Sequence, residues 1–132
     1  MKITTEDIAS DILELSSEQR LNIIQSLQEK KSKVSIMAKE LGATAPEVFR
    51  NFERLKKADP ITKDSDGYYN LTTYGQTVLS FLPTISFLSK NKKYFKDHNF
   101  GDLPQQSSIC QSTKITWEGK NLKAFDGYKF EW

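Results

Sequence analysis

Three cationic side chains, Arg50, Arg54 and Lys57, recur at helical spacing in the middle of the chain. Residues three or four positions apart lie on the same face of an α-helix. A guanidinium group on an exposed face can grip the O6 and N7 atoms of guanine in a fork, and a lysine ammonium group can hold a phosphate. The pattern therefore predicts a surface suited to double-stranded DNA, with Arg50 and Arg54 as base readers.

The same spacing also permits another interpretation of these cations. Glu47 and Glu53 lie within helical reach of Arg50 and Arg54, so the four residues can instead form ion pairs on a solvated helix face. Local charge favours the nucleic-acid interpretation. Residues 1–30 hold three basic and six acidic side chains, whereas residues 31–63 hold eight basic and four acidic ones. Positive charge is thus concentrated where phosphate binding would need it.

Two short helices and a tight turn are predicted to position these cations. Ser35 is expected to cap the first helix, and Gly42 to end it in the left-handed conformation that glycine adopts readily. Thr44 and Glu47 have the spacing of a capping box for the second helix, and Pro46 falls in its first turn, where the missing N–H donor costs nothing. This pattern is typical of a helix-turn-helix.

The second helix, residues 45–57, is the predicted recognition helix. Its apolar side chains Val48, Phe52 and Leu55 are expected to face the core. Phe49, at the edge of the exposed face, has two candidate roles, contact with a thymine methyl group or packing under the following hairpin, of which packing is favoured. The outward face should then carry Pro46, Glu47, Arg50, Glu53, Arg54 and Lys57. The amino-terminal half of such a helix enters the major groove.

A β-hairpin is predicted over residues 61–71, with Asp66-Gly67 in its turn. A hairpin that directly follows a recognition helix is a wing. Its tip carries carboxylates that a minor groove would repel, so the candidates for contact with the DNA backbone are Lys63 and Tyr68, with Asn70 as a further one. The complete set of predicted DNA-contacting residues is Ser35, Thr44, Pro46, Glu47, Arg50, Arg54, Lys57, Lys63 and Tyr68.

The remaining elements complete a mainly α (α+β) fold: a winged helix-turn-helix with a carboxy-terminal dimerisation helix and a short β tail. Helices are expected over residues 5–15 and, capped by Ser16, up to residue 29; another opens at Thr72 or Thr73, and Pro83 should break or kink it. Asp126-Gly127 signals a hairpin in the tail. The predicted organisation is a DNA-binding domain over 1–80, a helical dimerisation or linker segment over 81–104 and a β extension over 105–132.

A family resemblance rests on the runs Glu40-Leu-Gly-Ala-Thr-Ala-Pro-Glu-Val-Phe-Arg-Asn-Phe-Glu-Arg-Leu55, Leu71-Thr-Thr-Tyr-Gly75 and Phe87-Leu-Ser-Lys90. Over about residues 8–104 the chain resembles archaeal ArsR-like winged-helix transcriptional regulators. The resemblance implies that the DNA-facing segment contains Thr44, Pro46, Glu47, Arg50 and Arg54, and that residues 73–96 serve dimerisation. The short segment beyond Pro104 stands where those regulators have a long effector domain, so it gives no support for a small-molecule effector.

The sequence contains few signals for catalysis, metal binding or membrane insertion. It has no Gly-rich phosphate loop, and one cysteine with one histidine cannot close a metal site, so we expect no catalysis, cofactor or metal. No apolar run suits a membrane span, and the chain is expected to be cytoplasmic and homodimeric. The alternative function is a winged-helix protein-interaction module without specific DNA binding, which the acidic residues Glu47 and Glu53 would favour.

Overall fold

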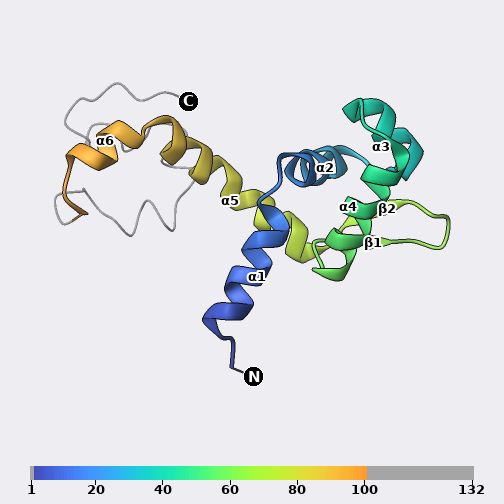
Figure 1. Ribbon diagram of the computed structural model, residues 1–132, viewed down its shortest axis with the longest axis horizontal. Coiled ribbons are helices and arrows are strands. Elements are labelled where there is room, and N and C mark those ends of the chain that lie inside the picture. Colours follow the sequence, from blue (N-terminus) through green and yellow to red (C-terminus); the bar gives the residue numbers. More distant parts are fainter. Residues whose placement is uncertain (1, 101–132) are drawn as a thin grey trace. The chain divides into compact units, whose positions relative to one another are not determined.

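The computed structural model describes residues 2–100, which fall into two compact units, one ending at Leu79 and the other beginning at Ser80. The β extension predicted over 105–132 lies outside the described residues. Figure 1 shows the elements in chain order: α1 (Thr5–Leu15), α2 (Glu18–Glu29), α3 (Val34–Leu41), α4 (Ala45–Lys57), β1 (Ile61–Lys63), β2 (Tyr69–Leu71), α5 (Thr73–Lys90) and α6 (Lys92–Asp97).

Polar caps set the first two helices. Thr4 and Asp7 form a capping box at the start of α1, with the Thr4 hydroxyl accepting the Asp7 backbone N–H and the Asp7 carboxylate accepting that of Thr4. Ser17 caps α2 by accepting the Arg20 backbone N–H, so the prediction that Ser16 caps this helix is wrong. Ser16 instead closes the end of α1, where its backbone N–H bonds the Leu13 carbonyl.

Helices α3 and α4 are joined by the predicted tight turn. Gly42 ends α3 at φ 63° and ψ 33°, a left-handed conformation that costs glycine little. The Thr44 hydroxyl then accepts the Glu47 backbone N–H and caps α4. Ser35, however, lies inside α3, whose cap position is Lys33 with no side-chain hydrogen bond. The predicted capping role of Ser35 is therefore wrong, because the helix begins earlier than that serine.

The hairpin follows α4 as predicted. Its strands pair antiparallel with Lys63 opposite Tyr69, and Gly67 occupies the turn at φ 87°. Ser32, in the segment between α2 and α3, exchanges two backbone hydrogen bonds with Tyr69, of 3.2 and 2.7 Å. No sequence pattern predicted this bridge, which adds a third short extended segment beside β2.

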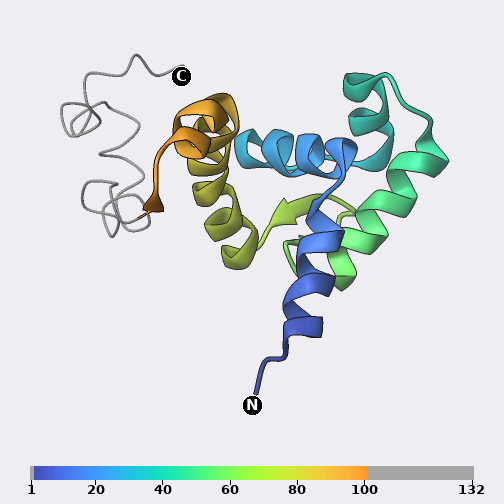
Figure 2. The ribbon, with the colours of Figure 1, turned by 60° about the vertical axis from the view of Figure 1, so that its left-hand side comes forward.

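The core of the first unit is built from α2, α3, α4 and the hairpin. Figures 1 and 2 both show the amino-terminal turns of α1 extending away from these elements. The Phe52 and Tyr69 rings meet with centroids 4.3 Å apart. The largest fully buried apolar side chains of the first unit include Tyr69, Phe52, Ile23, Ile24, Met37, Leu55, Ile61 and Val48. This unit is a small, mainly helical domain with a two-stranded antiparallel hairpin.

Gly75, in the first turns of α5, lies against the hairpin's entry. A Cβ atom at this position would lie 2.1 Å from the carbonyl oxygen of Pro60, so only glycine fits without a shift of the backbone. The Thr72 backbone N–H also bonds the Pro60 carbonyl, at 3.1 Å. The Thr-Tyr-Gly run that follows the hairpin therefore serves close packing of backbone against backbone.

The predicted break at Pro83 does not occur, since α5 continues through this proline to Lys90. Proline removes a single N–H donor from the helical hydrogen-bond pattern, and the residues on either side continue it. Within the second unit, the Tyr94 ring stacks on His98, with centroids 4.0 Å apart. In the part of the chain that the structure describes, no helix combines the length and apolar character that a membrane crossing needs.

Candidate nucleic-acid interface

The rotation of α4 about its own axis is fixed by three fully buried side chains, Val48, Phe52 and Leu55, each 0% exposed. This burial confirms the predicted inward face. Arg50 and Lys57 are consequently exposed on the opposite side, while Glu47 is half-buried near the amino-terminal end. The predicted outward face therefore exists as a surface of the folded domain.

The two arginines of this face have different surroundings. Among residues 2–100, no ion pair engages Arg50. Arg54 instead makes a bidentate pair across to α1: its Nε and Nη2 atoms donate to the Glu14 Oε2 and Oε1 atoms, at 3.0 and 3.1 Å. Arg50 is thus open to a ligand, whereas one edge of the Arg54 guanidinium is occupied.

Among the described residues, the carboxylates of α4 form no ion pair with Arg50 or Arg54, which was the alternative that helical spacing permits. Glu53 pairs with Lys56, at 3.1 Å, and accepts a hydrogen bond from the Tyr69 hydroxyl, at 3.0 Å. Arg54 reaches a carboxylate 40 positions away in the sequence, which helical spacing alone does not reveal. Its hydrogen bond to Glu14 raises the pKa of Arg54, and the same contact holds the pKa of Glu14 below its usual value.

A buried arginine, Arg20, holds the end of α1 near α4, where the Glu14–Arg54 pair forms. Arg20, only 8% exposed, donates to the Asn51 Oδ1 atom at 3.1 Å and to the backbone carbonyls of Leu13 and Glu14 at the end of α1. Asn51 in turn donates to the Gln19 side chain. These bonds fasten the end of α1 and the start of α2 to the inner side of α4, and burial lowers the pKa of Arg20.

The amino-terminal end of α4 and the α3 segment hold the remaining predicted contacts. Thr44, Pro46 and Ser35 are exposed. The Thr44 oxygen accepts the capping bond, and its hydroxyl proton remains able to donate. Phe49 is 48% exposed, so the prediction that it packs under the hairpin is wrong. Phe52 of the same helix packs against the hairpin instead, with its ring centroid 4.3 Å from that of Tyr69.

A second cationic group gathers at the hairpin. The Lys31 and Lys33 ammonium groups lie 4.7 and 4.8 Å from the Tyr68 ring centre, and Lys63 lies 5.6 Å from the Tyr69 ring centre. The bridge at Ser32 aligns the two flanking lysines with the hairpin. We call Lys31, Lys33, Lys63 and Tyr68 the hairpin cluster. Lys31 and Lys33 were not among the predicted site residues, although Lys30, Lys31 and Lys33 stand close together in the sequence.

The acidic tip of the hairpin is ordered by one of its own carboxylates. Asp64 accepts the backbone N–H groups of Asp66 and Tyr68, at 2.9 and 3.0 Å, and its other oxygen lies 4.0 Å from the Lys31 ammonium. The hydrogen bond from Tyr68 is the main reason that the pKa of Asp64 lies below its usual value. This carboxylate orders the turn and keeps its negative charge, so the repulsion expected at the tip stays a prediction.

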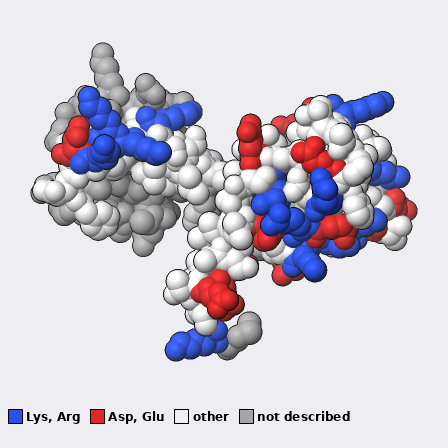
Figure 3. Space-filling view, viewed as in Figure 1, with Lys and Arg blue, Asp and Glu red and all other residues white. Residues whose placement is uncertain are grey.

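Charge on the face shown in Figure 3 is mixed over the first unit, with acidic groups next to basic ones. No protein-family model matches the chain, and no curated protein matches it. The resemblance to archaeal ArsR-like regulators thus stays a prediction. What the structure does provide is an exposed Arg50, a partly engaged Arg54 and the hairpin cluster, all positioned by one small core.

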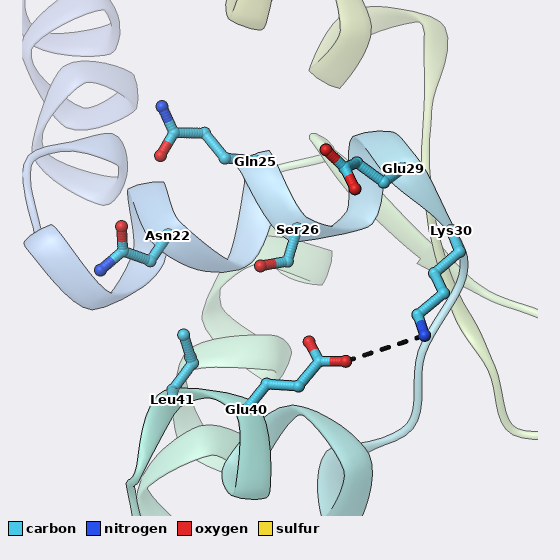
Figure 4. Close-up of a pocket in the computed structure, with 7 residues that line it drawn as sticks. All are labelled: Asn22, Gln25, Ser26, Glu29, Lys30, Glu40 and Leu41. Atoms are coloured by element: carbon cyan, nitrogen blue, oxygen red, sulfur yellow. Dashed lines mark ion pairs between the residues drawn. The ribbon is translucent and has the colours of Figure 1, made fainter.

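An open pocket elsewhere in the same unit lacks these features. It lies between α2 and α3, has a volume of about 530 Å³ and contains none of the predicted site residues. Figure 4 shows polar side chains around it and an ion pair of 4.0 Å between Lys30 and Glu40. Its lining consists of Asn22, Gln25, Ser26, Glu29, Lys30, Glu40 and Leu41. Nothing in this arrangement activates a nucleophile or gathers acid and base for catalysis.

Proposed function

We propose that this chain binds double-stranded DNA through a winged helix-turn-helix and acts as a transcriptional regulator. In this proposal α3 and α4 form the helix-turn-helix, α4 enters the major groove, and β1 and β2 form the wing. The observation that carries it is the exposed Arg50 on a helix whose rotation is set by three fully buried side chains. An arginine that is unpaired among the described residues, on a helix of fixed rotation, suits forked recognition of a guanine edge.

The hairpin cluster supports the same assignment from a second element. Lysines stacked on a tyrosine ring keep their charge at the surface, and ammonium groups there can neutralise backbone phosphates beside the major groove. The bridge between Ser32 and Tyr69 also supports a wing, because it joins the segment before α3 to the hairpin. The roles proposed are base contact for Arg50 and phosphate contact for Lys57 and the hairpin cluster.

The proposal includes a homodimer that reads two half-sites about one DNA turn apart. Phe81 and Ile85, one helical turn apart on α5, are 51% and 55% exposed. Large apolar side chains at helical spacing on a surface suit association with a second copy. We also propose that the protein works in the cytoplasm, where it would meet DNA directly in a cell without a nucleus.

The DNA proposal is tested in two steps: bound sequences are selected from a pool of random duplexes, and binding of the labelled selected duplex is then measured by fluorescence anisotropy. Affinity should fall steeply between about 50 and 200 mM salt. Arg50→Ala should weaken binding to the selected sequence by about 1–3 kcal/mol, whereas Lys2→Ala, which removes the same charge before α1, should change it little. Arg50→Lys keeps the charge and loses the fork, so it separates base reading from phosphate contact. The stoichiometry should be two chains for each duplex.

One observation favours the alternative function, a protein-interaction module. Phe49, 48% exposed on the same helix face, is an aromatic side chain of the kind that anchors protein interfaces. If the wild-type chain fails to bind duplex even at low salt, and Phe49→Ala abolishes capture of a protein partner, this function replaces DNA binding.

A further inference from the structure

The ion pair between Arg54 and Glu14 brings a carboxylate onto the face of α4 that is proposed to meet DNA. Both oxygens of Glu14 are engaged by Nε and Nη2 of Arg54. A duplex that recruits this edge of the guanidinium group must displace Glu14, because the two acceptors need the same donors. The contact therefore places α1 in competition with a nucleic-acid ligand.

The rest of α1 strengthens this competition. The helix contains no basic residue, and its acidic residues are Glu6, Asp7, Asp11 and Glu14. Asp11 and Glu14 line one pocket together with Arg54 and Lys57. A polyanion that approaches the last turns of α4 would therefore meet two carboxylates beside the two cations. The amino-terminal half of α4, with Arg50, lies outside this pocket.

The backbone of α1 is held at its carboxy-terminal end, where Arg20 binds the carbonyl groups of Leu13 and Glu14. The Glu14 side chain is held differently, because its carboxylate is bound by Arg54 at the surface. None of the residues of α1 is buried, so core packing does not fix this side chain. Release of Arg54 therefore requires only that the Glu14 side chain rotates, and the end of the helix stays in place.

We propose that α1 is an autoinhibitory arm, in which Glu14 withholds Arg54 from DNA. This inference rests on the proposed function. In the closed state DNA is held through Arg50 and the hairpin cluster; rotation of the Glu14 side chain away from Arg54, while Arg20 still holds the Glu14 carbonyl, adds Arg54 as a further contact and strengthens binding. An exposed ion pair is weak even in bidentate geometry, so its release should strengthen binding by about threefold to fivefold.

Glu14→Gln tests the proposal, because glutamine keeps the shape of the side chain and removes its charge. Duplex affinity should rise about threefold to fivefold, and the salt dependence should steepen by about one phosphate contact. Glu6→Gln is the matched control: it removes the same charge from the same helix, at an exposed position with no ion pair among the described residues, and should leave affinity nearly unchanged. Circular dichroism checks that each variant is folded.

The double variant Glu14→Gln/Arg54→Ala gives the decisive comparison. If Glu14 acts by withholding Arg54, the double variant should bind like Arg54→Ala alone, since the gain disappears when the arginine is absent. Weaker binding by Glu14→Gln would show that Glu14 orients Arg54 for DNA, and an effect equal to that of Glu6→Gln would show general charge repulsion; either result overturns the proposal.

Failure of the underlying function gives a different result. If neither the wild type nor Glu14→Gln binds duplex at low salt, the DNA proposal fails and the autoinhibitory role falls with it. If the wild type binds and Arg50→Ala weakens it while Glu14→Gln has no effect, only the autoinhibitory arm is wrong.

Discussion

Helices α1 and α4 are both amphipathic and similar in length, at 11 and 13 residues, yet they are held in opposite ways. Val48, Phe52 and Leu55 of α4 are completely buried, whereas α1 buries no residue. Apolar periodicity therefore predicts that a helix forms and which face is apolar. It does not predict whether the same molecule covers that face.

This difference has a functional consequence under the proposed roles. A helix locked by core packing presents its side chains at a fixed orientation, which base recognition requires. A side chain on a helix with no buried residue can change its rotamer at low cost, which a regulatory contact such as Glu14 requires. The three predictions that follow test this contrast between α4 and α1.

The largest effect is expected for Phe52→Ala on α4. Phe52 is 0% exposed and its ring packs against Tyr69, so truncation leaves a cavity between α4 and the hairpin. The free energy of unfolding should fall by about 3–5 kcal/mol, measured by urea denaturation. Phe52→Leu should cost less, because leucine fills most of the space. A loss below about 1 kcal/mol for Phe52→Ala would show that α4 is not anchored by this core.

A smaller effect is expected for Tyr69→Phe, which removes the hydroxyl that bonds Glu53 of α4. The loss at neutral pH should be about 1 kcal/mol. Burial is the main cause that raises the pKa of Tyr69 to about 12 from an ordinary value of 10.0. The folded state then holds this proton more tightly than the unfolded state. The stabilisation that this proton contributes to the folded state should be fully present below pH 10 and should be lost as the pH rises through 12.

The alkaline decline distinguishes this hydroxyl from general alkaline unfolding. Tyr69→Phe should flatten the dependence of the unfolding free energy on pH between about 10 and 12, since no proton is left to release at this position. An unchanged slope in the variant would mean that the Tyr69 proton is not held by the fold. The link between the hairpin and α4 would then rest on ring packing alone.

Local signals in the sequence predicted most of the helical framework. Gly42, Thr44 and Pro46 mark the turn between α3 and α4, and each acts through its own backbone conformation or cap, which neighbouring residues determine. The placement of the α3 cap was wrong, since Lys33 takes that position without a side-chain bond. The cap signal at Ser35 thus did not set the start of the helix.

The candidate site was less predictable because its contacts join distant parts of the chain. Glu14 reaches Arg54 only because Arg20 and Asn51 fix the end of α1 against α4. Lys31 and Lys33 join the hairpin through the backbone bridge at Ser32, which has no sequence signature. Periodicity predicts which face of a helix carries a charged side chain. It does not predict which oppositely charged residue from another part of the chain will lie beside it.

The smallest effect is expected for Ile12→Ala on α1. Ile12 is 60% exposed, so its truncation should change the free energy of unfolding by less than about 0.5 kcal/mol. Ile24→Ala is the matched control, because Ile24 on α2 is 0% exposed and the same truncation there should cost about 2–5 kcal/mol. Urea denaturation at two protein concentrations measures both. A large loss for Ile12→Ala that grows with protein concentration would mean that a second chain covers α1, and the contrast with α4 would then hold only for the isolated chain.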